Sequence, residues 1–197
     1  LDMDLLGEHL NALARGEEIH LPRYNFVTRV QSGPIGRPMR LGKDEVAVCE
    51  GIHALNDDIA AYCPDAFRLY ISARSIVVDS DGREVFKGTW MRLLRRLVRD
   101  SNFRGTPAAA TLDMWANVRR GEKRFISPFK ERANLMFDSS FPCEVSILKN
   151  YAAPLLAAVP EGAERYAEIR SILPALERFE TIDPALLAPE SMLREFI

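Results

Sequence analysis

The chain has 197 residues, close to the length of a single domain. It is 47% hydrophobic and 27% charged, which provides a packed core and argues against intrinsic disorder. Its formal net charge is −2, so binding to nucleic acid or to an anionic membrane would require a local basic cluster. No apolar run approaches the roughly 18 residues of a membrane-spanning helix, and no secretory signal is visible.

The cysteines Cys49, Cys63 and Cys143 are widely spaced and form no CxxC pair, so neither a zinc knuckle nor a redox motif is offered. We expect free thiols in a reducing cytoplasm. The first residue is Leu1 rather than Met, and we expect the chain to begin inside a larger polypeptide.

The N-terminal third begins with an amphipathic pattern. Residues 2–15 have leucines at helical spacing, and Gly16 stands where a C-terminal cap belongs. Residues 18–28 alternate loosely and predict an extended segment. The glycines and prolines of 33–38 predict a turn-rich loop, after which 39–41 could return as the second strand of a hairpin.

The rest of the chain alternates strand and helix patterns. Residues 45–50 (EVAVCE) form a short apolar run typical of a buried parallel strand, and 67–72 predict the next strand. Helices are expected at 89–101, 107–120, 162–178 and 185–196, and a short strand at 134–137. Residues 143–158 begin as a strand or a helix and lead into a helix. This order favours an α/β fold with a mostly parallel sheet flanked by helices. We expect one domain over 1–197, with 160–197 as a helical C-terminal extension.

Glu50 is the last residue of the predicted strand and precedes Gly51. Open α/β sheets bind ligands at the carboxyl edge of their strands, where an acid can hold magnesium directly or through water. His53 lies two residues beyond the glycine. The alternative is an ordinary strand end followed by a loop histidine.

Arginines recur along the predicted helix at 89–101. Arg92, Arg96 and Arg99 share one helical face, and Arg104 lies just beyond. Like charges stacked in this way repel, whereas guanidinium groups bind phosphates in bidentate fashion. The face therefore predicts a phosphate site, with a solvated face neutralised by acids elsewhere as the alternative.

A second basic stretch contains Arg119, Arg120, Lys123 and Arg124 between aromatic residues. Its composition fits a mobile lid over phosphates or a charged surface helix. The segment LPRYNFVT places Tyr24 and Phe26 on one side of a strand. Two aromatics at this spacing could line a flat base, or could serve ordinary sheet packing.

The printed sequence contains no GxxxxGK[ST] phosphate-binding loop. It also contains no GxGxxG, GxSxG or HExxH. These residues therefore supply no Walker A motif for nucleotide binding.

Several pieces, in this order and spacing, resemble the uridine kinase and phosphoribulokinase superfamily. They are LDMDLL, GEEIHLPRYNFVT, LGKDEVAVCEGIHALN, RLLRRLVRDSNFRG, ATLDMWANVRRGE and SPFKERANLMFDSS. The resemblance implies a P-loop kinase fold, with ATP and Mg²⁺ as cofactors. It also implies transfer of the γ-phosphate to the 5′-hydroxyl of a uridine- or cytidine-like nucleoside.

The same resemblance implies roles for individual residues. Glu50 would be the catalytic, Walker-B-like carboxylate near magnesium. The nucleoside would be bound by Tyr24, Phe26, Arg29 and His53, with Arg29 standing where relatives often carry His. ATP phosphates would be bound by Arg92, Arg96, Arg99, Arg104, Arg119 and Arg120.

Two departures from the family pattern stand out. The family's phosphate-binding loop and catalytic base lie upstream of LDMDLL, so we expect this chain alone to be inactive and its sheet to expose an edge that favours dimerisation. GTWMRLLRR stands where relatives usually read TDTRLLRR, which puts Trp90 in place of an acid. Two alternatives stay open: a non-catalytic kinase-like module that binds nucleotide or RNA, and a kinase acting on another small hydroxyl acceptor.

Overall fold

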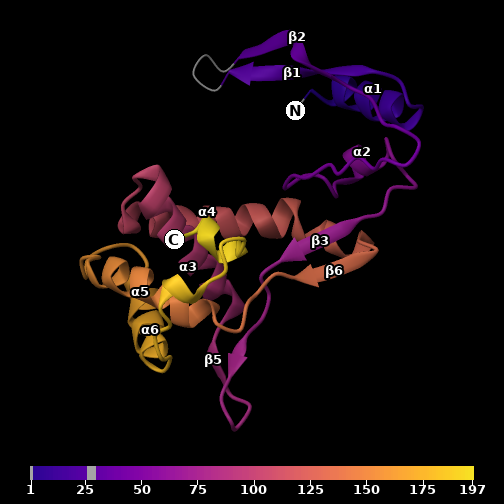
Figure 1. The fold of residues 1–197 in the computed structure, drawn as a ribbon. Coiled ribbons are helices and arrows are strands. Elements are labelled where there is room, and N and C mark those ends of the chain that lie inside the picture. The colour runs from indigo at the N-terminus through magenta and orange to yellow at the C-terminus, as the bar shows by residue number, and fades with distance from the viewer. Residues whose placement is uncertain (1, 26–29) are drawn as a thin grey trace. The chain divides into compact units, whose positions relative to one another are not determined.

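The computed structural model describes residues 2–25 and 30–197 and has a mixed α/β fold (Figure 1). The chain divides into two compact units. The N-terminal unit comprises Leu1–Arg68 and Phe125–Asn134, and the helical unit comprises Leu69–Arg124 and Leu135–Ile197. The expected mixed α/β class is confirmed, whereas the described strands form three separate two-stranded sheets, one parallel and two antiparallel, instead of one mostly parallel sheet.

Helix α1 (Met3–Ala14) opens the N-terminal unit as predicted. Asp2 caps it, because its carboxylate accepts a hydrogen bond from the Leu5 amide at 3.1 Å. Gly16 follows the helix with a φ of 72°, a conformation that glycine adopts without strain. Ala12 and Leu13 pack against Ile19 to form a small apolar cluster.

An antiparallel hairpin of β1 (Ile19–Asn25) and β2 (Val30–Met39) follows. The prediction of a loop over 33–38 is wrong, because this segment belongs to β2. A two-stranded ribbon has only edge strands, which tolerate proline, and its register is irregular around Pro22. Gly36 permits the close pairing, since a Cβ atom there would lie 2.5 Å from the carbonyl oxygen of Leu21.

The prediction of a buried strand over 45–50 is also wrong. This segment has no regular secondary structure, and the side chains of Val46 and Val48 are 84% and 87% exposed. An inner parallel strand requires hydrogen-bonded neighbours on its sides, and no described strand pairs with these residues. A strand-forming sequence is thus irregular and exposed to solvent here.

The remainder of the N-terminal unit consists of short elements. Helix α2 (Asp57–Ala60) and the 3₁₀ helix η1 (Ser127–Arg132) are joined by an ion pair between Asp57 and Arg132. Asn134 fixes the end of this region, since its side-chain oxygen accepts from the Arg68 amide at 2.8 Å. These polar contacts connect the two chain segments of the unit.

Strands β3 (Leu69–Ser72) and β6 (Leu135–Asp138) pair in parallel and lie side by side in Figure 1. The predicted strands at 67–72 and 134–137 are therefore confirmed with shorter or shifted bounds. Leu69 pairs with Leu135 and Ile71 with Phe137, and all of these side chains are exposed. The pair thus presents apolar side chains without a covering layer among the described residues of its unit.

Helices supply most of the helical unit. In chain order they are α3 (Gly88–Arg104), α4 (Ala108–Phe125, its last residue in the N-terminal unit), α5 (Glu144–Ala157) and α6 (Tyr166–Glu177). A hairpin of β4 (Val77–Val78) and β5 (Glu84–Phe86) precedes α3 and was not predicted. The turn dipeptide Asp81-Gly82 between valines is the signal that could have revealed it.

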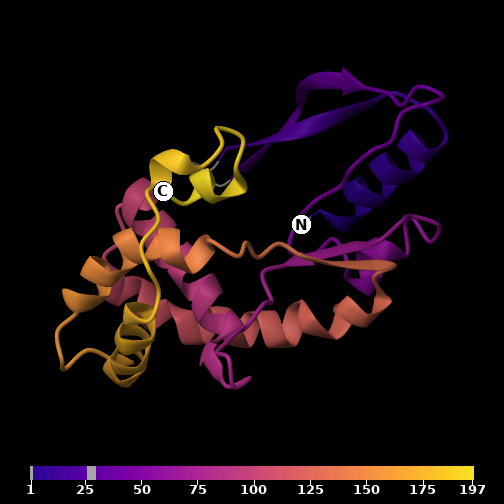
Figure 2. The ribbon, with the colours of Figure 1, turned by 60° about the horizontal axis from the view of Figure 1, so that its bottom comes forward.

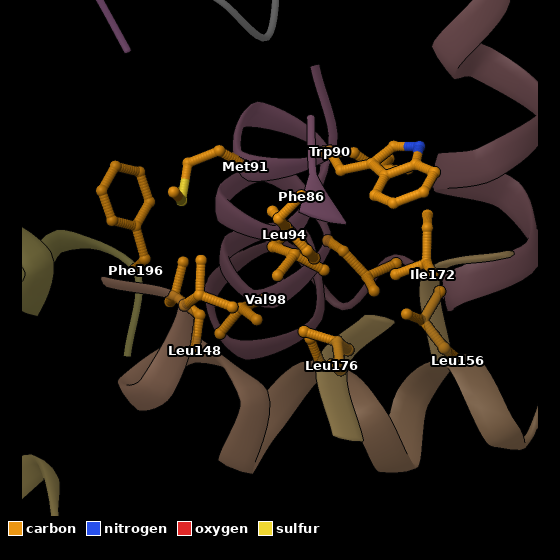
Figure 3. Packing of buried hydrophobic residues seen from close by; sticks show 14 of the residues in the cluster. Phe86, Trp90, Met91, Leu94, Val98, Leu148, Leu156, Ile172, Leu176 and Phe196 are labelled. Atoms are coloured by element: carbon orange, nitrogen blue, oxygen red, sulfur yellow. The ribbon is translucent and has the colours of Figure 1, made fainter. Parts of the chain in front are cut away.

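The core of the helical unit forms around α3 (Figure 3). Leu93, Leu94, Leu97 and Val98 have no exposed surface, and Figure 3 shows Leu94 and Val98 converging with Leu148 of α5 and Leu176 of α6. Full burial of each such side chain stabilises the fold by about 2 kcal/mol. Helix α3 is therefore a rigid platform, and its remaining faces are available for charged residues.

The C-terminal residues differ from the prediction of a helix over 185–196. They form two 3₁₀ turns, η2 (Pro184–Leu186) and η3 (Met192–Glu195). Pro189 lies between the turns and lacks the amide hydrogen that a continuous helix would need. Leu193 and Phe196 are buried in the core around α3, so the tail is fixed to the helical unit.

Candidate functional site

Four of the six predicted phosphate-binding arginines lie on α3 beside its buried stripe, and Arg119 and Arg120 lie on α4. We call Arg92, Arg96, Arg99 and Arg104 the arginine face. The apolar stripe of α3 is anchored in the core, so the position of each Cα on this face is fixed. The ion pairs of these arginines are compatible with the predicted shared helical face.

Glu122 connects this face to α4. Its carboxylate forms ion pairs with Arg92 and with Arg119, the latter at 2.6 Å. The two ion pairs place the Glu122 carboxylate between the guanidinium groups, and the Glu122 side chain is only 11% exposed. The structure thus brings together one predicted arginine from each of two helices through an acid that sequence reasoning missed.

Asp100 has the same relation to two arginines on its own helix. It pairs with Arg96 at 3.2 Å and with Arg104 at 2.9 Å. The Thr111 hydroxyl donates to the same carboxylate at 3.3 Å. The i, i+4 spacing on each side of Asp100 was the signal available in RRLVRDSNFR.

Arg95 lies off the arginine face and has a structural role. It forms a bidentate ion pair with Glu144, whose side chain is fully buried at the start of α5. Arg95 also donates to the Ser139 carbonyl at 2.6 Å. These contacts join α3 to the segment after β6 and leave little donor capacity for a ligand.

The ion pairs leave a surplus of positive charge on this part of the helical unit. Six arginines share four carboxylates: Arg92, Arg95, Arg96, Arg99, Arg104 and Arg119 pair with Asp100, Glu122, Glu144 and Glu195. Arg120 donates instead to the neutral side chain of Asn117. The alternative of neutralisation by acids therefore holds only in part, and the surplus of two positive charges suits an anionic ligand.

The carboxyl ends of β3 and β6 are joined by Asp138. Its carboxylate accepts from the Arg74 amide at 3.0 Å, the Ser140 hydroxyl at 2.7 Å and the Ser75 hydroxyl at 2.9 Å. Partial burial acts to raise the pKa of Asp138, but the hydrogen bonds from Ser140, Arg74 and Ser75 outweigh it and hold the pKa well below its ordinary value. Asp138 is thus an ionised group that fixes this sheet edge.

The predicted nucleoside-binding residues fall in the N-terminal unit. Tyr24 lies near the end of β1 with 49% of its surface exposed. Phe26 and Arg29 lie outside the described residues. Only one of the two predicted base-lining aromatics is therefore described.

Glu50 and His53 are close in the chain but differ in environment. Glu50 is exposed at the end of the irregular 45–50 segment. His53 is half-buried, and its Nδ1 atom is buried without a hydrogen-bond partner among the described residues. An orphaned ring nitrogen retains the capacity to bind a polar group.

Comparison with known proteins identifies the family. A model described as the phosphoribulokinase/uridine kinase family matches residues 1–145. The chain belongs to this family. Uridine kinases of Bacillus pumilus and Staphylococcus haemolyticus are 29% and 28% identical to it over 147 residues, or 74% of this chain. A uridine kinase of Anoxybacillus flavithermus is 29% identical over 136 residues, or 68% of this chain.

The chain spans about three-fifths of the length of these uridine kinases: 61%, 62% and 56% of the three relatives, respectively. The family match contains the arginine face, Glu122 and Glu50. It ends at residue 145, so nearly all of α5 and the whole of α6, η2 and η3 lie beyond it. The C-terminal segment that packs on α3 is thus outside the region matched to the family.

Trp90, which departs from the family pattern, packs in the core of the helical unit. Its ring is buried and meets Phe86 of β5 edge to face, with ring centroids 5.4 Å apart. The Lys87 ammonium lies 5.0 Å from the Trp90 ring centroid. Trp90 therefore fastens the β4–β5 hairpin to α3.

Residues 2–25 and 30–197 contain neither a candidate membrane span nor a candidate cluster of metal ligands. None of their helices combines the length and apolar character of a membrane span. No group of three or more His, Cys, Asp or Glu side chains in the same residues is arranged to hold a metal ion.

Proposed function

We propose that the protein to which this chain belongs transfers the γ-phosphate of ATP to the 5′-hydroxyl of a uridine- or cytidine-like nucleoside. The observation that carries the proposal is the charge-rich face of α3 and α4, where arginines outnumber carboxylates on a rigid scaffold. Phosphoryl transfer depends mainly on positioning and on stabilising charge on the phosphates. The membership of the family supports the reaction class.

The arginines that would bind the phosphates form two clusters, each around one acid. Arg92 and Arg119 around Glu122, and Arg96 and Arg104 around Asp100, are held in fixed positions by those acids. Each guanidinium has five N–H donors, so an ion pair leaves donors for a phosphate. We assign these four residues, together with Arg99 and Arg120, to binding of the triphosphate.

On the acceptor side we assign the base to Tyr24 and the nucleoside hydroxyls to His53, whose Nδ1 atom is unpartnered among the described residues. Glu50 would hold Mg²⁺, directly or through water. Magnesium keeps several waters and takes one or two carboxylates together with substrate phosphates, so an exposed carboxylate of this kind fits. ATP would supply the transferred phosphoryl group and its β-phosphate the leaving group.

We further propose that the 197 printed residues do not transfer phosphate by themselves. They contain no GxxxxGK[ST] motif, whose backbone amides and lysine cradle the β- and γ-phosphates.

The proposal is tested by measuring ADP release from the intact protein with ATP and Mg²⁺. Uridine, cytidine, other nucleosides and other small hydroxyl compounds would be supplied as acceptors in turn. We expect turnover with a pyrimidine nucleoside. Turnover with a different hydroxyl compound alone would change the substrate class, and a lack of turnover with every acceptor would favour a non-catalytic binding module.

A matched pair of substitutions tests the assigned acid. Glu50→Gln should lower kcat at least roughly a hundredfold, since it removes the group assigned to magnesium. Asp44→Asn removes a carboxylate from the same exposed stretch and should leave kcat within about twofold. Equal activity of the two variants would remove Glu50 from the site.

A further inference from the structure

The C-terminal turn η3 lies against α3 (Figure 2). Ser191 caps the turn, because its hydroxyl accepts from the Leu193 amide at 3.4 Å. Leu193 is fully buried and Phe196 nearly so. The turn is therefore anchored by its apolar residues and is a fixed part of the helical unit.

Phe196 packs its ring against two guanidinium groups of α3. The Arg95 and Arg99 carbon atoms at the guanidinium centres lie 5.3 Å and 5.9 Å from the ring centroid. The Asn102 side-chain amide donates to the Phe196 carbonyl at 3.2 Å. Contacts of this kind between arginine and an aromatic face are attractive and restrict the orientation of the guanidinium plane.

Arg99 has unused donors, whereas most donors of Arg95 are engaged. Arg95 is committed to Glu144 and Ser139. The Nε atom of Arg99 is buried and has no hydrogen-bond partner among the described residues. The nearest carboxylate to Arg99 is that of Glu195, at 3.5 Å from Nη1.

The Glu195 side chain is held much less firmly than the turn that carries it. It is 60% exposed and reaches Arg99 only at a long ion-pair distance. Such exposed pairs contribute little to stability and are screened by salt. An anion could take the place of the Glu195 carboxylate at Arg99 while Leu193 and Phe196 stay in the core.

We infer that the C-terminal turn forms one wall of the polyphosphate-binding face of α3. Phe196 is a positioning residue that orients Arg99, and the Glu195 carboxylate is an internal competitor that an incoming phosphate displaces. This inference rests on the proposed binding of the triphosphate by α3. It goes beyond that proposal because residues 191–197 lie outside the part of the chain matched to the family.

The test is calorimetric titration of the intact protein with inorganic tripolyphosphate, followed by ATP, at low ionic strength. Glu195→Gln removes the competing charge and should tighten tripolyphosphate binding roughly two- to fourfold. Glu190→Gln is the matched control, since it removes the same charge from an exposed residue of the same C-terminal segment. A gain that is equal in the two variants would overturn the role of Glu195.

A second pair of variants tests Phe196. Phe196→Leu keeps an apolar side chain but removes the aromatic face, and it should weaken tripolyphosphate binding roughly two- to fourfold. Phe179→Leu removes a ring that packs on Phe86 instead, and it should leave the affinity unchanged. Equal losses in both variants would reduce Phe196 to a packing residue and overturn its positioning role.

Arg99→Gln separates this inference from the proposed function. In that background, Glu195→Gln should no longer change the affinity, because the group for which it competes is absent. If wild-type protein binds tripolyphosphate through Arg92 and Arg96 but Glu195→Gln behaves like its control, the inference fails while the proposed phosphate site stands. If substitution of the arginine face leaves binding intact, or none is detected, both fail.

Discussion

The two compact units place their predicted functional residues on very different supports. The helical unit buries a large apolar cluster around α3, and its arginines project from that helix into fixed ion pairs. The N-terminal unit has a small cluster at Ala12, Leu13 and Ile19, and carries Glu50 on an exposed segment without regular structure. Rigid packing thus orients the phosphate-binding candidates, whereas the acceptor-side candidates lack comparable support within their own unit.

In the helical unit, the ion pairs and the apolar core therefore depend on each other for stability. Buried carboxylates at Asp100 and Glu144 are stable only because arginines on α3 pair with them. Removing an acid should therefore cost stability here, and removing an exposed acid of the N-terminal unit should not.

The largest effect is expected for Glu144→Gln. It would leave the Arg95 guanidinium only partly paired at 12% exposure and should lower the free energy of unfolding by about 4 kcal/mol. Urea denaturation followed by fluorescence would measure it, since both tryptophans, Trp90 and Trp115, lie in the helical unit. Glu177→Gln, an exposed acid on α6, is the control and should cost less than about 0.5 kcal/mol.

Truncation of the two apolar clusters compares the units directly. Leu94→Ala should cost about 3 kcal/mol, because it opens a cavity in a fully buried site. Leu13→Ala should cost only about 1 kcal/mol, because its cluster is small and can relax. Hydrogen exchange of amides in α3 and α1 would report each unit separately, and equal losses would contradict the proposed difference in support.

A smaller effect depends on pH. The pKa of Asp138 is lowered in the folded chain, so its stabilising contribution is fully present above the ordinary pKa near 3.8 and is lost as the pH falls below it. Asp138→Asn should cost about 1 kcal/mol at neutral pH, since the group is largely solvent-exposed.

The difference in thermal stability between wild type and Asp138→Asn should shrink as the pH is lowered from about 5 towards 2. Asp113→Asn, on the exposed side of α4, should show no such trend. A gap that stays constant over this pH range would argue against an ionised Asp138 at the sheet edge.

The smallest effect concerns two thiols of the N-terminal unit. Burial raises the pKa of Cys63, and Cys49 adds a smaller raising effect, whereas Cys49 itself is exposed. Iodoacetamide at pH 8 should therefore modify Cys49 roughly fivefold faster than Cys63. Mass spectrometry would measure both rates, and unfolding in urea should equalise them.

Local patterns in the sequence predicted the elements whose stability is local or amphipathic. The leucine spacing of 2–15 with Gly16 gave α1 and its end, and the paired apolar stripe and arginines of α3 gave its buried and charged faces. The prediction of a strand over 45–50 was wrong because strand formation depends on distant partners. Its composition fits a strand, but a strand forms only where hydrogen-bonded neighbours exist, and pairing is a property of the whole sheet.

The family resemblance, the order of most helices and strands, and the arginine-rich face of α3 could be predicted from the sequence alone. Periodicity and motif spacing are local properties of the chain, so they need no knowledge of distant contacts. Which distant acids pair with the arginines of α3 depends on the tertiary structure. Glu122, Glu144 and Glu195 lie 30, 49 and 96 positions from their partners Arg92, Arg95 and Arg99, and packing of α4, α5 and η3 on α3 brings them together.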